Sequence, residues 1–211
     1  MKISYGITVC NELVEIQRLV SFLLENKRPI DEIVILFDSK NGSLEVLSYL
    51  NKVQGPSVNV IKNEFNGDFA GWKNFLTEQC LGEYVFQIDA DELPHKNLIL
   101  NLPSILSLNP KNEVYMVPRI NTVEGITQEH INKWGWAQNS LGWINFPDYQ
   151  SRIWKKSDKI RWVGKVHERL SNYNTYSGLP DQEIYCLYHD KQIERQEKQN
   201  NLYSNIMNNN E

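Results

Sequence analysis

Three carboxylates follow one another closely in the segment EYVFQIDADELP at residues 83–94, where an apolar run ends in Asp89, Asp91 and Glu92. Carboxylates at this spacing repel one another unless a cation or a tight set of hydrogen bonds offsets their charge. Side chains two apart in an extended strand point to the same side, so we expect Asp89 and Asp91 to project together. Mg²⁺ and Mn²⁺ prefer such oxygen ligands. The alternative is a helix cap or a solvated turn before Pro94.

The elements around these residues alternate between strand and helix. Strand patterns occupy residues 2–10, 32–38, 57–62 and 83–89, and helical patterns occupy residues 12–26, 43–50 and 69–80. This alternation, with strands apolar on both faces, predicts a mostly parallel central sheet flanked by helices. Ligands of such sheets bind beyond the carboxyl ends of the strands. Asp38 ends the second strand, so a second acidic side chain falls on the predicted ligand edge.

The second half of the chain is less regular. We expect a helix at 97–109 that is interrupted near Pro103. Strands are expected at 113–119, 150–156 and 183–189, and a long excursion at 121–149 separates the first two of them. We expect one domain over residues 1–190, with a nucleotide-sugar half at about 1–95 and an acceptor half at about 96–190. Residues 191–211 are predicted to form a C-terminal helix or tail, either a frayed terminus or a linker to a further domain.

Composition bounds the class of protein. The 211 residues are 41% hydrophobic, which suffices for a sizeable core, and the net charge of −4 gives no electrostatic footprint for nucleic acid or an anionic membrane. The three cysteines, Cys10, Cys80 and Cys186, lack any CxxC spacing, which predicts reduced thiols and a reducing, cytoplasmic compartment. No signal-peptide pattern and no apolar run of about 18 residues is present, so we expect a soluble protein with no transmembrane segment.

A set of motifs in chain order resembles the family 2 glycosyltransferases of GT-A fold, with lipopolysaccharide-core glucosyltransferases and phage or viral enzymes among the nearest in pattern. The motifs are ITVCNE (7–12), DEIVILFDS (31–39), FAGWKNFLTEQCLGEYVFQIDADE (69–92), FPDYQSRIWKK (146–156), IRWVGKVHERL (160–170) and LYH (187–189). The resemblance covers about residues 3–190 and implies an α/β, Rossmann-like GT-A sheet with a smaller acceptor-side region. Two departures are the missing proline before Cys10 and the turn DSKNGS (38–43) in place of a glycine- and threonine-rich one.

The resemblance also implies a donor site. A nucleotide-diphosphate sugar, with UDP-hexose as the family default, is expected to bind Val9, Asn11, Glu12, Asp38, Lys73, Asp89, Ala90 and Asp91. Asp91 is expected to be a direct ligand of Mn²⁺ or Mg²⁺, Asp89 to contact the ribose or a metal-bound water, and Asp38 to accept a hydrogen bond from the base. His189 is expected to complete the metal site, because imidazole is acceptable to Mn²⁺. Open alternatives are a capping role for Glu12, a solvated Lys73 and a structural strand-end His189.

An inverting transferase needs a base that takes the proton of the attacking hydroxyl. By resemblance, Glu168 holds this role at the start of a helix. Asp148 is the alternative base, or a ligand of an acceptor hydroxyl. The structural alternative for Glu168 is an ion pair, for instance with Arg169 or Arg152.

The acceptor side is predicted from the tryptophan-rich excursion. Trp134, Trp136 and Trp143, together with Arg152, are candidates for binding the acceptor, because flat indole faces suit the C–H faces of sugar rings. The alternative for these tryptophans is a small hydrophobic cluster. The remaining three, Trp72, Trp154 and Trp162, are predicted to lie in the core. The acceptor itself is expected to be a glycan or a lipid- or protein-linked saccharide.

These observations predict a metal-dependent inverting glycosyltransferase. A sugar nucleotidylyltransferase would need a glycine-rich, basic loop after the first strand, and TVCNELVE at residues 8–15 contains neither glycine nor Lys/Arg. A nucleotide-sugar or carbohydrate-binding module without turnover is the alternative from another class, and a product assay distinguishes it from an enzyme.

Overall fold

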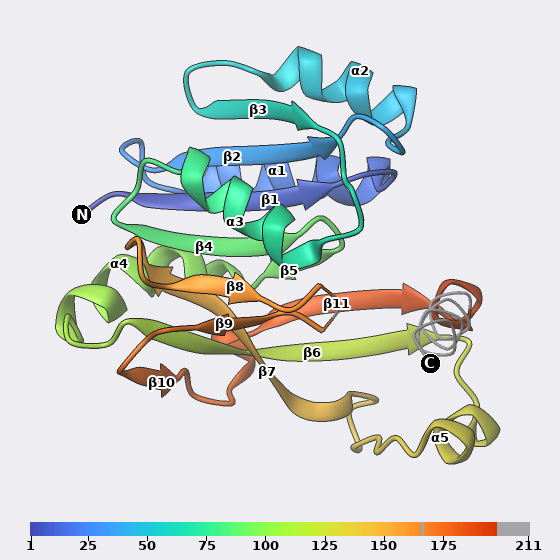
Figure 1. Cartoon of the computed structure of the whole chain (residues 1–211). Coiled ribbons are helices and arrows are strands. Elements are labelled where there is room, and N and C mark those ends of the chain that lie inside the picture. Colours follow the sequence, from blue (N-terminus) through green and yellow to red (C-terminus); the bar gives the residue numbers. More distant parts are fainter. Residues whose placement is uncertain (166, 198–211) are drawn as a thin grey trace.

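The computed structural model describes residues 1–165 and 167–197, and a large mixed sheet runs through the centre of this part (Figure 1). Its first half consists of four parallel strands in the spatial order β3–β2–β1–β4, which are β1 (Ile3–Val9), β2 (Glu32–Asp38), β3 (Val58–Asn63) and β4 (Tyr84–Asp89). The connecting helices are α1 (Leu13–Asn26), α2 (Leu44–Val53) and α3 (Phe69–Gln79). The predicted alternation and parallel pairing are confirmed.

The second half continues the same sheet with mixed strand directions. β7 (Ile144–Lys155) pairs antiparallel with β4, and the order goes on through β6 (Val114–Glu124), β11 (Leu187–Gln192) and β5 (Glu92–Pro94). The remaining elements are α4 (Lys96–Leu108), α5 (Gln128–Trp134), the 3₁₀ turn η1 (Glu183–Tyr185), β10 (Tyr176–Gly178), and a separate hairpin of β8 (Arg161–Val163) and β9 (Arg169–Ser171).

Two apolar layers sandwich the sheet. In β2, Ile33 and Ile35 face the layer covered by α1, α2 and α4, whereas Val34 and Leu36 face the layer covered by α3 and the β8–β9 hairpin. A strand buried on both faces reads as a continuous apolar run, as this one does. Trp154 and Trp162 belong to the second layer as predicted, and the two layers together hold the strand ends in fixed positions.

Two expectations about the elements were wrong in detail. Helix α4 continues through Pro103, because buried side chains on both sides of the proline, Leu98 and Leu106 among them, hold the helix while the proline removes only one hydrogen bond. The predicted strand at 183–189 divides into η1 and β11. The excursion at 121–149 includes the end of β6, helix α5 and the start of β7.

All three cysteines are free thiols, as predicted, with Cys80 and Cys186 buried. Residues 193–197 are helical, and the rest of the predicted C-terminal helix or tail, residues 198–211, lies outside the described residues. Within the described ranges, no helix is both long enough and apolar enough to cross a membrane.

Candidate active site

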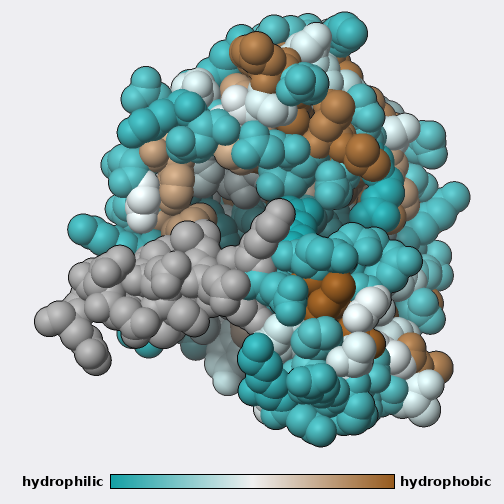
Figure 2. Space-filling model, turned by 90° about the vertical axis from the view of Figure 1, so that its right-hand side faces the viewer, coloured by the Kyte–Doolittle hydropathy of each residue, from teal (hydrophilic) through white to brown (hydrophobic). Residues whose placement is uncertain are grey.

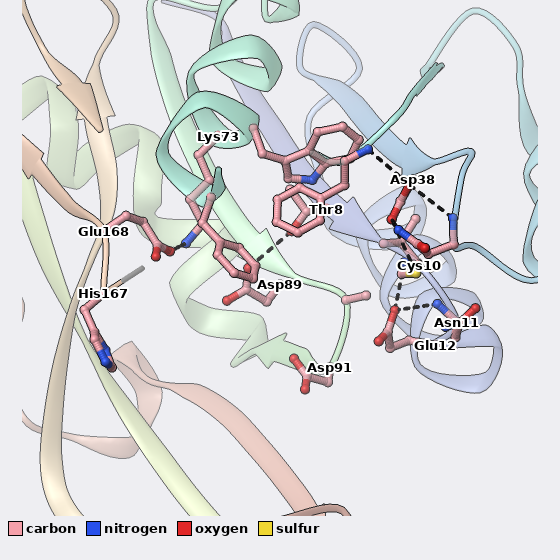
Figure 3. A pocket seen from close by; sticks show the side chains of 16 residues that line it. Thr8, Cys10, Asn11, Glu12, Asp38, Lys73, Asp89, Asp91, His167 and Glu168 are labelled. Atoms are coloured by element: carbon pink, nitrogen blue, oxygen red, sulfur yellow. Dashed lines mark hydrogen bonds and ion pairs between the residues drawn. The ribbon is translucent and has the colours of Figure 1, made fainter. Parts of the chain in front are cut away.

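A cleft of about 620 Å³ lies at the carboxyl ends of β1, β2 and β4. Figure 2 shows this end of the molecule, with mostly hydrophilic side chains around a hollow. The eight side chains predicted to bind a donor all line the cleft, and the predicted base Glu168 lines it as well (Figure 3); the eight are Val9, Asn11, Glu12, Asp38, Lys73, Asp89, Ala90 and Asp91. They gather because parallel strands end at one edge of the sheet.

Asp38 ends β2 and lines one end of the cleft. Its Oδ1 accepts hydrogen bonds from the backbone N–H groups of Lys40 (3.0 Å), Asn41 (3.3 Å) and Phe65 (3.2 Å), and its Oδ2 accepts one from the Asn41 side chain (2.8 Å). Burial would raise the pKa of Asp38, but these hydrogen bonds outweigh burial and hold the pKa below its ordinary value. The loop after Asp38 also packs too closely for a side chain at Gly42, where a Cβ would lie 2.4 Å from the carbonyl oxygen of Asp38. Asp38 thus orders the loops beyond β2 and β3.

Glu12 occupies the N-cap position of α1 without capping the helix through its side chain. Its Oε2 instead accepts hydrogen bonds from the backbone N–H groups of Cys10 (2.9 Å) and Asn11 (3.0 Å). The carboxylate therefore fixes the turn after β1, which forms the wall of the cleft.

Two arginines from the second half of the sheet offset part of the negative charge of the crowded carboxylates. Arg152 on β7 lies 2.6 Å from Asp89 and 2.5 Å from Glu92, and Arg119 on β6 lies 3.0 Å from Glu92. The side chain of Glu92 is fully buried, and that of Arg152 is 4% exposed. Burial would raise the pKa of Asp89, but the charges of Arg152, Lys73 and Arg119 and the hydrogen bond from Arg152 together outweigh it and hold the pKa well below its ordinary value. For Asp89 and Glu92, the offset that we attributed to a divalent cation comes from arginine.

The two aspartates of the D-x-D segment face different partners. The chain turns at residues 90 and 91, so the expected projection of Asp89 and Asp91 to one side of an extended strand was wrong. Asp91 lies with its Oδ2 3.5 Å from His189 Nε2 and 3.3 Å from the Arg195 guanidinium. His189 Nδ1 lies 2.8 Å from Asn121 Oδ1. Asp91 and His189 therefore come together as predicted, whereas Asp89 is directed to Arg152.

A divalent cation fits this pair of side chains in part. Two ligands of one Mg²⁺ or Mn²⁺ ion lie about 3 Å apart, close to the observed distance between Asp91 and His189. Asn121 holds the other imidazole nitrogen, as an outer partner of a metal-binding histidine does. Across the described residues, however, no three His, Cys, Asp or Glu side chains group as a metal site. The remaining ligands would have to come from a substrate or water.

An aromatic wall, formed by Phe65, Phe69 and Trp72, lines the cleft beside Asp38. The ring centroid of Phe65 lies 4.7 Å from that of Phe69 and 5.6 Å from that of Trp72. Trp72 was predicted to be a core residue, but it is only partly buried because it lies on the first turns of α3, at the edge of the apolar layer. The spacing of Phe69 and Trp72 on one helix face was the signal for this wall in the sequence.

Glu168 lies in the turn between β8 and β9 and not at the start of a helix, as the resemblance had implied. Its Oε1 is 2.6 Å from the Nζ of Lys73, so its ion-pair partner is neither Arg169 nor Arg152. Figure 3 shows the two side chains pointing toward each other across the cleft. Lys73 is 8% exposed, so its alternative as a solvated lysine was wrong.

A second cleft of about 640 Å³ adjoins the first and shares Lys73, Asp89, Asp91, His167 and Glu168 with it. Its other side is lined from the second half of the chain, by residues that include Tyr149, Gln150, Ser151, Arg152 and Arg169. Glu168 thus stands between two spaces, one facing the parallel strands and the other facing β6 and β7.

Asp148 lies farther along β7 and does not line either of these clefts. Its Oδ2 is 2.6 Å from Arg119 and also accepts a hydrogen bond from Asn121 at 2.9 Å, while its Oδ1 accepts one from Gln150 at 2.7 Å. Burial would raise the pKa of Asp148, but the charge of Arg119 and the hydrogen bonds from Asn121, Arg119 and Gln150 together outweigh it and lower the pKa. Asp148 is therefore held by three partners.

The three tryptophans of the excursion make contacts with other aromatic rings. Trp134 stacks on His130 with ring centroids 5.2 Å apart and lies 4.7 Å from Trp136, while Trp143 contacts Phe146 at 4.8 Å. Trp136 lines a cavity of about 260 Å³ together with Asp148 and His189. Arg152 lines the second cleft from a buried position in its ion pairs.

Comparison with known sequences gives a family match over most of the chain. The model of the family described as "Glycosyl transferase family 2" matches residues 4–177. The SPbeta prophage-derived glycosyltransferase SunS of Bacillus subtilis (strain 168) is 24% identical over 176 residues, which cover 82% of this chain and 35% of SunS. Glycosyltransferase SunS of Bacillus phage SPbeta matches with the same figures. The chain therefore spans about a third of the length of these curated relatives.

Solved structures of TarS from S. aureus have the same fold. TarS 1–349 in complex with UDP matches with a TM-score of 0.64 and 19% identity, covering 90% of this chain and 60% of that one. TarS 1–349 in complex with UDP-GlcNAc matches with a TM-score of 0.63 and 18% identity, covering 90% and 59%. These likenesses confirm the predicted α/β architecture, a central sheet flanked by helices.

Proposed function

The chain belongs to glycosyltransferase family 2, and from this premise we propose that it transfers a sugar from a nucleotide-diphosphate donor to a hydroxyl group of an acceptor, with inversion at the anomeric carbon. The observation that carries the proposal is the single cleft in which eight donor-site candidates meet Glu168. UDP is the proposed nucleotide, because the TarS structures of the same fold are complexes with UDP and UDP-GlcNAc.

The nucleoside would lie at the Asp38 end of the cleft. The aromatic wall offers flat faces for the base, and the loops ordered by Asp38 offer backbone groups at its edge. A hydrogen bond from the base to Asp38 would have to share a carboxylate oxygen with the Asn41 side chain or with a backbone N–H group. We therefore propose that Asp38 acts mainly through the loops that it holds.

The diphosphate would lie toward Asp91. Asp91 and His189 would hold a Mn²⁺ or Mg²⁺ ion, and the Arg195 guanidinium would give up its contact with Asp91 to that ion. Such an ion stabilises the negative charge that develops on a departing nucleoside diphosphate. Asp89, held by Arg152, would face the ribose.

Glu168 would act as the general base. Its carboxylate accepts the proton of the acceptor hydroxyl while that oxygen forms a bond to the anomeric carbon. The bond between the anomeric carbon and the phosphate oxygen breaks in the same step, and the electron pair leaves with the nucleoside diphosphate. Attack from the second cleft, on the face opposite the leaving group, produces inversion.

The acceptor would occupy the second cleft, between Glu168 and β7. Its wall includes Tyr149, Gln150 and Ser151, whose polar side chains would exchange their present partners, Leu179, Asp148 and Met116, for hydroxyl groups of a saccharide. A glycan, free or linked to lipid or protein, is therefore the proposed acceptor class, and a hexose is the proposed sugar.

Thermal unfolding in the presence of UDP, GDP, dTDP or CMP, each with Mn²⁺ and each with chelator, tests the donor. Ligand at 100 times its dissociation constant adds about 2.7 kcal/mol, which for a domain of this size raises the midpoint by about 5 to 10 °C. We expect this shift with UDP and Mn²⁺ and a smaller one with chelator. No shift with any of the four nucleotides would contradict the proposal.

A further inference from the structure

Lys73 links the two halves of the cleft. It lies on α3, lines both clefts, and places its Nζ 2.6 Å from Glu168 Oε1. The same ammonium lies 4.6 Å from the ring centroid of Trp162. The side chains of Lys73 and Glu168 are only 10% and 16% exposed, so water screens this ion pair less than it screens an exposed pair.

The elements that carry the pair are fixed to each other by backbone contacts. Asn74, the next residue of α3, donates a hydrogen bond to the carbonyl of Trp162 and accepts one from its N–H, both at 2.9 Å. The N–H of Phe69 donates to the carbonyl of Lys165 at 3.1 Å. These hydrogen bonds hold α3 next to Trp162 and Lys165 without the ion pair. The ion pair is therefore not needed to hold these segments together.

An ammonium at 2.6 Å occupies Oε1, one of the two carboxylate oxygens through which a general base accepts the proton of its substrate. A hydroxyl group approaching Glu168 from the second cleft would compete with Lys73 for hydrogen bonding to the carboxylate. Lys73 also lines both clefts together with Asp89 and Asp91. The ammonium is therefore within the electrostatic reach of the part of the cleft where the diphosphate is proposed to bind.

We infer that Lys73 is a positioning residue that exchanges partners: without donor it restrains Glu168, and with donor bound it turns to the diphosphate and releases the carboxylate. This inference rests on the proposed function. The exchange needs no proton transfer, because the ammonium keeps its charge and moves from a carboxylate oxygen to a phosphate oxygen. Its consequence is that the base becomes available only when a donor is present.

The exchange makes a prediction about binding that does not involve turnover. If Glu168 and the diphosphate compete for Lys73, removing the carboxylate leaves the ammonium unpaired in the protein without donor and favours the bound state. Glu168→Ala should therefore bind UDP about three to ten times more tightly than the wild type. Isothermal titration calorimetry with UDP and Mg²⁺ measures this directly.

Three further variants separate competition from other effects. Glu78→Gln removes one negative charge from the exposed face of the same helix, where Glu78 pairs with Arg161, and should leave the affinity for UDP unchanged. In a Lys73→Met background, Glu168→Ala should no longer tighten binding, because the ammonium for which the carboxylate and the diphosphate compete is absent. In a Lys73→Arg background, which keeps the positive charge, the tightening should persist; this variant also serves if Lys73→Met does not fold.

The outcomes are distinct from those of the proposed function. A wild-type protein that binds none of the nucleoside diphosphates would overturn the proposed function and the inference with it. Wild-type binding of UDP that Glu168→Ala leaves unchanged or weakens would overturn the inference alone. Equal tightening by Glu168→Ala with and without Lys73 would also overturn it, because simple repulsion between the carboxylate and the phosphates would then explain the gain.

Discussion

Replacing Arg152 by methionine tests whether arginine, and not a metal ion, makes the crowded carboxylates tolerable. The variant leaves Glu92, which is fully buried, and Asp89 without the guanidinium that lies 2.5 and 2.6 Å from them. Removing one partner of a buried ion pair costs about 3 to 5 kcal/mol. Because Arg119 still lies 3.0 Å from Glu92, we expect a loss at the lower end, about 3 kcal/mol.

Urea unfolding at neutral pH, followed by circular dichroism, measures this loss. The matched control is Arg161→Met, which breaks an exposed pair with Glu78 at 3.2 Å and should cost less than about 1 kcal/mol. If Arg152→Met does not fold, the double variant with Glu92→Gln should recover part of the stability, since it removes the uncompensated charge. A loss no larger than that of the control would show that Arg152 does not compensate the charges of Asp89 and Glu92.

The pH dependence of the same variant gives a second check. The pKa of Asp89 is lowered in the folded protein, so its contribution to stability is present above the ordinary aspartate pKa of about 4 and is lost as the pH falls below it. Arg152 lowers this pKa both by its charge and by its hydrogen bond. The difference in unfolding free energy between wild type and Arg152→Met should therefore shrink between pH 7 and pH 3. A difference that is constant over this range would contradict the assignment.

Two further substitutions address the donor cleft. Trp72→Ala removes part of the aromatic wall and should weaken UDP binding about tenfold in calorimetry, because stacking on an aromatic ring contributes about 1 to 3 kcal/mol per base. Trp143→Ala, outside the cleft, should leave UDP binding unchanged. Equal effects of the two substitutions would contradict the proposed place of the base. Asp91→Asn should abolish the part of the UDP-induced thermal shift that depends on Mn²⁺, whereas Asp158→Asn, at an exposed position outside both clefts, should retain it. A shift in Asp91→Asn that still responds to chelator would place the metal elsewhere.

The sequence was most informative where short-range patterns decide the structure. The continuous apolar run 32–38 predicted β2, because a strand buried on both faces is apolar at every position. The helical spacing of apolar residues in 12–26 predicted α1 almost to the residue, because a helix buried on one side is apolar along one stripe. Since parallel strands end at one edge, the donor-site candidates were predicted to lie together, and they line one cleft. What could not be seen was which side chain faces which.

Partner choice depends on contacts between distant segments. Lys73 and Glu168 are far apart in the chain, and nothing in either segment specifies the 2.6 Å ion pair between them. Arg152 reaches Asp89 and Glu92 only because β7 pairs with β4. The turn at residues 90 and 91 likewise redirects Asp91 in a way that an extended-strand argument does not anticipate.

The most direct test of the account is the release of UDP from UDP-GlcNAc and UDP-glucose, with water or an oligosaccharide as acceptor, by the wild type and by Glu168→Gln. General base catalysis contributes about 10² to 10⁴ in rate. We therefore expect wild-type release with at least one donor and a loss of at least about a hundredfold in the variant, with UDP binding retained. Wild-type binding of UDP without any release, or equal release by the two proteins, would contradict the claim that Glu168 serves as the base of a sugar transfer in this cleft.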